Sequence, residues 1–296
     1  MKQRATTTMA AVGAVLLLAT ACGQARAGTA LPKGDEAAAY VSAKFEGAMD
    51  KLSDTLGMQR DTTAAFETYF RLDEKWLRAT ITSARLGSPE TRVSRNHSQK
   101  NPDESLDNFI PAEGTVSYMY LGPVYKSLAP TAWVSMPKPE SGNSLVCAWA
   151  GIAPACKMVS AVQRAFSSNK KAVTGARTLP DGKTEVTAAV PLGAFLDARV
   201  EVLPQSALDQ IGTEMRKEIV PTKITIGPDG VLSQIVMEAT LTKENHRIEL
   251  REDFHFTGKA TPQDFPKLPD PADVTVLPDQ PAVDDFYRRL GELQGS

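Results

Sequence analysis

Alternation of apolar and polar side chains runs through residues 222–258 and constrains the fold more than any other feature of the sequence. "TKITIGPDGVLSQIVMEATL" holds two such runs, joined at Gly227–Gly230 by the proline and glycines that a tight turn needs. "HRIELREDFHFTG" continues the pattern, with charged residues opposite apolar ones. An apolar face and a charged face predict an antiparallel sheet with one face in water. The residues that share inner faces are Val231, Ser233, Ile235, Met237, Ala239 and Leu241 in one run, and Ile248, Leu250, Phe254 and Phe256 in the next.

Further strands and helices follow from the same kind of pattern. Residues 66–95, 114–122, 131–137 and 178–190 have strand character, and the polar stretch 96–107 is expected to be a loop. Apolar spacing of three and four residues predicts helices over 35–56, 156–166, 191–200, 207–219 and 282–293. A proline-rich stretch precedes the last helix and favours an extended coat on the surface. The expected fold class is α+β, with residues 35–296 as a single domain.

The first residues resemble a secretory leader. Lys2 and Arg4 precede an apolar run, Met9–Ala21, which is too short to cross about 30 Å of hydrocarbon as a helix. The small residues before Cys22 resemble a bacterial lipobox, which implies cleavage after residue 21 and lipidation of Cys22. The alternative is an ordinary cleaved leader in which this cysteine has no role. Residues 22–34 are small and polar and are expected to form a flexible tether.

Charge argues against a nucleic-acid partner. The chain of 296 residues has a net charge of −2, and removal of Lys2 and Arg4 with the leader brings it to −4. Nucleic-acid binding requires a basic face instead. A hydrophobic content of 42% is enough for a substantial core.

Two further cysteines, Cys147 and Cys156, stand close together in "VCAWAGIAPAC". Outside a reducing cytosol, such a pair is typical of a disulfide. The spacing fits no zinc motif, and the chain has only three histidines. We therefore expect a Cys147–Cys156 disulfide, no metal site and no cofactor.

Catalytic motifs are weak. Ser167 and Lys170 match Ser-x-x-Lys, but the Ser141–Asn143 stretch that imitates a second box of that enzyme class comes before it, in the wrong order. The aspartates near the C-terminus are separated by prolines and fit no compact calcium loop. The sequence predicts no catalytic residue and a protein that is not an enzyme.

Taken together, residues 114–278 resemble the actinobacterial LppX/LprA/LprF/LprG lipoproteins, within the broader LolA-like group of lipid carriers. The resemblance rests on "GTVSYMYLG…APTAWVSM", "EVTAAVPLGAFL", "VPTKITIGPDGVLSQIVMEATL" and "LREDFHFTGKATPQDFPKLPDPADVTVLPD". It implies a strongly curved antiparallel half-barrel with helices across its concave face. An acylated lipid or glycolipid would lie between the two layers.

The expected function is therefore non-catalytic lipid binding or carriage by a lipoprotein anchored to the outer face of the cell membrane through Cys22. The alternative is an envelope module that binds a protein partner or assists signalling, and a hydrolase with a dispersed site is a third, weaker possibility. A void between sheet and helices would favour lipid carriage, whereas a filled interior would favour the protein-binding module. Eight residues are predicted to line the lipid cavity, and core packing is the competing explanation for some of them. The eight residues are Val116, Tyr118, Tyr120, Trp133, Ile235, Met237, Phe254 and Phe256.

Overall fold

The computed structural model describes residues 56, 59–138, 147–169 and 172–294. The expected leader, Cys22, the tether and the predicted helix before Leu56 lie outside these residues, as do the Ser141–Asn143 stretch and Lys170.

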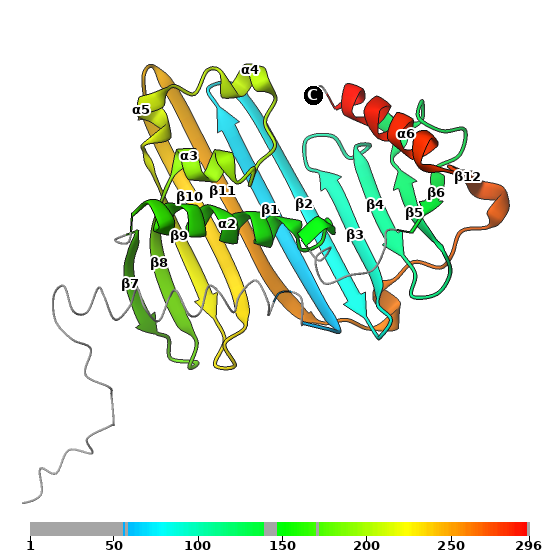
Figure 1. Cartoon of the computed structure of the whole chain (residues 1–296), viewed down its shortest axis with the longest axis horizontal. Helices are drawn as coiled ribbons and strands as arrows, with labels where there is room; N and C mark the ends of the chain where they lie inside the picture. The colour runs from blue at the N-terminus through cyan, green and yellow to red at the C-terminus, as the bar shows by residue number, and fades with distance from the viewer. Residues whose placement is uncertain (1–55, 57–58, 139–146, 170–171, 295–296) are drawn as a thin grey trace, which may run out of the picture.

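In the part of the chain that the structure describes, twelve strands form one open, curved sheet (Figure 1). Within the described residues, neighbouring strands are antiparallel, except that β12 runs parallel to β6. The strand order is β12-β6-β5-β4-β3-β2-β1-β11-β10-β9-β8-β7. The strands are β1 (Thr62–Leu72), β2 (Lys75–Leu86), β3 (Thr91–Ser98), β4 (Ser105–Ile110), β5 (Val116–Leu121), β6 (Trp133–Pro137), β7 (Val173–Thr178), β8 (Thr184–Pro191), β9 (Ile219–Ile226), β10 (Leu232–Lys243), β11 (His246–Lys259) and β12 (Val274–Val276).

The chain enters the sheet at its centre. It runs outward from β1 to β6 through successive neighbours, and later returns from the opposite edge, β7, to β11. The two halves meet where β11 pairs with β1, with Phe66 opposite Phe254. The connection from β6 to β7 has to pass from one half of the sheet to the other, and it contains the longest described helix, α2 (Ala153–Ser168). This topology therefore places a helix across one face of the sheet.

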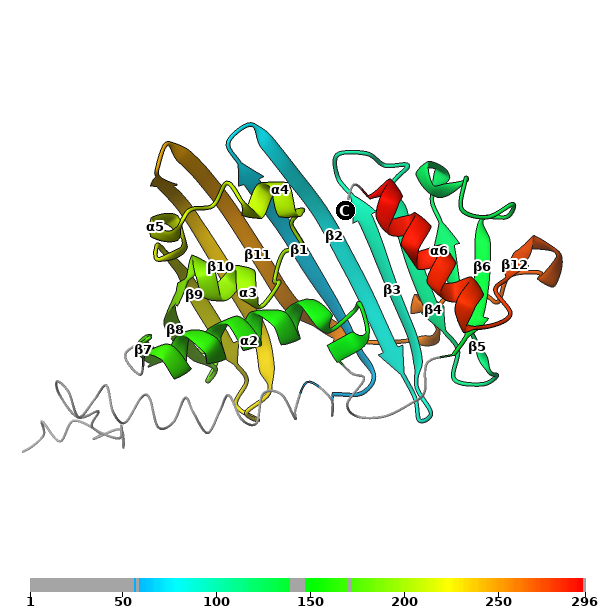
Figure 2. The same cartoon turned by 45° about the horizontal axis from the view of Figure 1, so that its top comes forward.

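The main core lies between α2 and the half of the sheet formed by β7–β11 and β1. Pro154 stands in the first turn of α2, where its missing N–H costs no hydrogen bond. Met158, Val159 and Val162 then recur on one buried face. Three short helices pack on the same side (Figure 2). They are α3 (Leu192–Asp197), α4 (Gln205–Leu208) and α5 (Thr213–Arg216).

A second core lies at the other end of the sheet, beneath α6 (Gln280–Leu293). Asp279 caps this helix by accepting a hydrogen bond from the backbone N–H of Ala282 at 3.0 Å. Val283, Phe286 and Leu290 point from α6 to the sheet and pack with residues of β4, β5 and β6. The figures show α2 and α6 at opposite ends of the sheet (Figures 1 and 2).

The proline-rich segment covers part of the opposite face, as its composition predicts. Short 3-10 turns at Pro262–Asp264 and Pro271–Asp273 carry it toward β12. Phe265 packs near Val93 and Phe109, and Arg95 donates a hydrogen bond to the carbonyl oxygen of Asp264 at 2.7 Å.

Two expectations about local structure need correction. The polar stretch 96–107 is a loop only at its centre, residues 99–104, because β3 runs to Ser98 and β4 begins at Ser105. Its polar side chains fit strands that are partly open to solvent. Residues 207–219 do not form one helix, because the chain leaves the helical conformation between α4 and α5, at Gly212.

Candidate functional site

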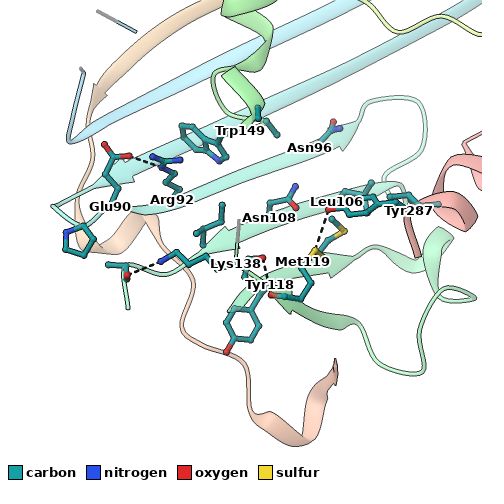
Figure 3. A pocket seen from close by; sticks show the side chains of 18 of the residues that line it. Glu90, Arg92, Asn96, Leu106, Asn108, Tyr118, Met119, Lys138, Trp149 and Tyr287 are labelled. Carbon is teal, nitrogen blue, oxygen red and sulfur yellow. Dashed lines mark hydrogen bonds and ion pairs between the residues drawn. The ribbon is translucent and has the colours of Figure 1, made fainter. Parts of the chain in front are cut away.

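A groove lies on the helix-bearing face of the sheet, between the segment before α2 and helix α6 (Figure 3). Its volume is about 910 Å³, within the range of about 300–1,000 Å³ typical of small-molecule sites. We call it the α2–α6 groove. Its lining residues are Arg60, Ser88, Pro89, Glu90, Arg92, Asn96, Leu106, Asn108, Ile110, Ala112, Ser117, Tyr118, Met119, Met136, Lys138, Ala148, Trp149, Ala150, Tyr287, Leu290 and Gln294.

The strand registers explain which side chains form the floor. Asn108 of β4 is paired with Ser94 of β3 and with Met119 of β5. Because cross-strand partners point to the same face and every second residue does so along a strand, this row and its neighbours two residues away make one surface. Arg92 and Leu106 belong to the adjacent rows.

Trp149 forms the wall on the α2 side. Its indole is buried at 6% exposure, and no described residue accepts a hydrogen bond from its Nε1. The guanidinium of Arg92 lies over the ring, 5.8 Å from its centroid. Gly151 permits this close packing, because a Cβ there would lie 2.5 Å from the Trp149 ring and 2.6 Å from Cβ of Ser83.

Helix α6 forms the opposite wall and makes that end apolar. Leu290 is buried, whereas Tyr287 is exposed and extends over the groove toward Met136, with its hydroxyl 3.6 Å from the sulfur. Leu106 and Met119 complete this end from the sheet. Methionine side chains adapt their shape to an apolar partner more readily than branched ones do.

The other end of the groove is basic. Arg92 donates from Nε to a carboxylate oxygen of Glu90 at 2.8 Å. Lys138 donates from Nζ to the carbonyl oxygens of residues 111 and 112, at 2.7 and 3.0 Å. Beneath them Arg85 is 1% exposed. Burial lowers the pKa of the Arg85 guanidinium; Glu90 raises it, and the charges of Arg92 and Arg60 lower it.

The lining residues expected from the sequence do not gather in this groove. Ile235, Met237 and Phe254 are fully buried in the main core, which they share with residues of α2. Phe256 packs beside that core with its ring 5.3 Å from that of Phe254.

The remaining four belong to β5 and β6. The rings of Tyr120 and Trp133 pack edge to face, with centroids 5.3 Å apart. They lie on the face of the sheet away from the groove, and Val116 lies on the same face because side chains alternate along β5. Tyr118 borders the groove, but its ring stacks with Phe109, 6.3 Å away, on the same opposite face.

The structure contains the expected disulfide between Cys147 and Cys156, with Cα atoms 5.7 Å apart. It ties the segment that carries Trp149 to the first turn of α2. The crosslink therefore holds one wall of the groove against the main core.

The sequence pattern did not indicate the polar residues of the groove. Arg92, Asn96 and Asn108 occupy inward positions of strands that hold polar residues on both faces, so alternation gave no signal for them. A signal did exist for α6, whose Tyr287 and Leu290 stand on the apolar side of a predicted amphipathic helix. The amphipathic pattern does not indicate, however, which face of the sheet this helix covers.

The described part of the chain contains no cluster of three or more metal-ligating side chains. Among the same residues, no helix has the length and apolar character needed to cross a membrane.

Comparison with known proteins assigns no family. No family model matches the chain, and no curated protein does. Among solved structures, lipoprotein LppX of Mycobacterium tuberculosis shares 10% identity over 76% of this chain and 97% of its own, at a TM-score of 0.28. The MucA/MucB complex of Pseudomonas aeruginosa shares 9% identity over 75% of this chain and 61% of the matched one, at 0.27. A LolA superfamily protein of Nitrosomonas europaea shares 9% identity over 78% of this chain and 97% of its own, at a TM-score of 0.23. TM-scores this low carry no functional argument, so function has to follow from the chain's own residues.

Proposed function

We propose that this protein binds an acyl chain of a lipid or glycolipid in the α2–α6 groove, without catalysing a reaction on it. The observation that carries the proposal is the groove itself, a preformed hollow on a rigid sheet with an apolar wall supplied by α6. A buried methylene contributes about 0.8 kcal/mol, so an acyl chain laid along Leu106, Met119 and Leu290 would bind without any covalent step.

The ligand of this proposal lies beside α2 and not beneath it. The inner face under α2 is filled by Met158, Val162, Ile235 and Phe254, each at or below 1% exposure. In contrast, the face between the two helices is left open, and its floor includes the partly exposed side chains of Asn108 and Ile110. On this proposal the helix-bearing face is the concave side of a LolA-like half-barrel, and the opening between its helices replaces an internal cavity.

The wider setting of the proposal is the cell envelope. Cys22 would carry the lipid anchor on the outer face of the cell membrane, residues 22–34 would act as a tether, and residues 35–296 would form one domain. Two acyl chains or more are needed for stable attachment. Mass spectrometry of the N-terminal peptide from membranes of the native host tests this: the expected peptide starts at an acylated Cys22, and an unmodified one would contradict the anchor.

Lipid binding is tested by filling the groove. Asn108 points into it and forms no side-chain hydrogen bond with another described residue, so Asn108→Trp adds bulk to open space. Thr240→Trp is the matched control, because Thr240 is exposed on the opposite face of β10. The full chain should bind the uncharged fluorophore phenylnaphthylamine saturably, and Asn108→Trp should weaken binding by about tenfold or more. Equal binding by both variants, or none by the wild type, would refute the proposal.

A second candidate function is docking of an envelope protein, and the filled core beneath α2 is the observation that favours it. The two functions separate when protein purified from its host is extracted with organic solvent. Stoichiometric lipid supports acyl binding, whereas a clean extract together with a saturable protein partner that Asn108→Trp displaces supports docking.

A further inference from the structure

The charged side chains of the α2–α6 groove are gathered at one end. The charged residues of the lining are three bases, Arg60, Arg92 and Lys138, and one acid, Glu90. The lining therefore carries two net positive charges (three minus one). The whole chain, in contrast, has a net charge of −2. Figure 3 shows Glu90, Arg92 and Lys138 on one side and Leu106, Met119 and Tyr287 toward the other. The groove is therefore amphipathic along its length.

These cations keep donors available to a ligand. Glu90 is the only described residue that accepts a hydrogen bond from Arg92, and it accepts the Nε proton. The N–H groups of the two terminal guanidinium nitrogens can therefore donate to a ligand. Lys138 uses two of its three ammonium protons on backbone carbonyls. Arg60 makes no ion pair with another described residue and is exposed. The buried guanidinium of Arg85 adds positive charge from beneath.

Two amides lie close to the apolar end, because Asn108 is paired with Met119 and Asn96 is paired with Leu106. Asn96 and Asn108 face the groove, and neither side chain forms a hydrogen bond with another described residue. An amide offers donors and an acceptor, so it suits the ester or hydroxyl groups that join a headgroup to its chain. Leu106 and Met119 continue the surface toward α6.

We infer that the ligand is an anionic amphiphile, with its phosphate or carboxylate group between Arg92 and Lys138 and its acyl chain directed toward α6. This rests on the proposed function, because it names the class of ligand for the same groove. Charge-assisted hydrogen bonds from a guanidinium and an ammonium select an anion. Glu90 holds Arg92 in position and disfavours a second anion.

The test compares ligands that share one chain and differ in headgroup charge. Oleate, oleyl alcohol and oleylamine compete with phenylnaphthylamine for the full-length protein at neutral pH and low salt. Oleate should displace the probe at a concentration at least about tenfold lower than oleyl alcohol does, and oleylamine should be the weakest. The double variant Arg92→Gln, Lys138→Gln should lose the preference for oleate and keep the affinity for oleyl alcohol. Arg78→Gln, an exposed arginine on β2 outside the groove, is the matched control.

The outcomes separate the two levels of the proposal. Equal displacement by all three ligands, or an unchanged preference in the double variant, would overturn the anionic headgroup while acyl binding stands. Displacement of the probe by inorganic phosphate alone would also overturn it, because the site would then take a free anion. A wild-type protein that never binds the probe would refute the proposed function as well.

Discussion

Replacing Glu252 by glutamine should change how the stability of the protein depends on pH. Glu252 lies on the inner face of β11 beneath α2, is 0% exposed, and neither of its oxygens has a hydrogen-bond partner among the described residues. Burial raises the pKa of this carboxyl well above its ordinary value of 4.5, and the neighbouring carboxylate of Glu201 raises it further. The native protein therefore keeps a proton on Glu252 that the unfolded chain loses.

The groups around Glu252 come from three elements. Glu201, after α3, has its own pKa raised by burial and accepts a hydrogen bond from the Thr68 hydroxyl of β1 at 2.8 Å. Lys157 approaches from α2, and burial lowers the pKa of its ammonium. The positive charge of Lys157 lowers the pKa of Glu252, but this effect is smaller than those of burial and Glu201.

The sign and size of the effect follow from proton linkage. Above pH 4.5 and below the raised pKa, the native state binds more protons than the unfolded state, so the free energy of unfolding falls as pH rises. One proton contributes a slope of about 1.4 kcal/mol per pH unit. Glutamine stays neutral at every pH and removes this contribution, whatever fixed cost the new amide brings.

Urea unfolding of the wild type and Glu252→Gln at a series of pH values measures the slope. The stability difference, variant minus wild type, should rise by up to about 1.4 kcal/mol per pH unit and level off above the pKa of Glu252. Glu238→Gln, at a side chain 62% exposed on β10, makes the same chemical change at the surface and serves as the control. A difference for Glu252→Gln that stays constant across the range would refute the reasoning, because the carboxyl would then titrate alike in both states.

Three further changes test the packing around the groove. Gly151→Val should overpack the Trp149 ring, which costs about 1–3 kcal/mol of unfolding free energy and lowers the thermal midpoint. A midpoint equal to that of the wild type would contradict the close approach of Gly151 to the ring. Phe286→Ala removes a fully buried ring from α6 and should cost about 3–5 kcal/mol in denaturant unfolding; a cost below about 1 kcal/mol would mean that α6 is not packed as described. Replacing both disulfide cysteines by serine should lower the free energy of unfolding by about 2.5–3 kcal/mol, measured against the wild type under oxidising conditions, and no change would contradict a formed crosslink.

The sequence predicted the sheet best where packing and alternation coincide. The runs on either side of Gly227–Gly230 became β9 and β10, because one face of each is buried along its length. In β10 the side chains follow the expected inward alternation only from Ile235 onward. At the start of the strand Leu232 is buried instead, because the register with β9 shifts between Leu232 and Gln234. A bulge of this kind leaves no clear mark in the pattern.

The groove could not be predicted because it arises from long-range arrangement. The pairing of β1 with β11 joins residues almost two hundred positions apart, and it fixes which half of the sheet α2 covers. Alternation identifies Ile235 and Phe254 as inward-facing, but it does not distinguish a face covered by a helix from one that stays open. The polar inward positions of β3 and β4, such as Asn108, gain meaning only once α2 and α6 are seen on either side.

Photocrosslinking tests the central claim most directly. The full-length protein is loaded with a diazirine-labelled oleate, irradiated and digested, and the modified residues are located by mass spectrometry. We expect adducts on the groove side of β4 and β5 and on α6, at residues such as Met119 and Leu290, and their loss in Asn108→Trp. Adducts concentrated on β10 and β11 beneath α2, or labelling that no excess of oleate prevents, would contradict binding in the α2–α6 groove.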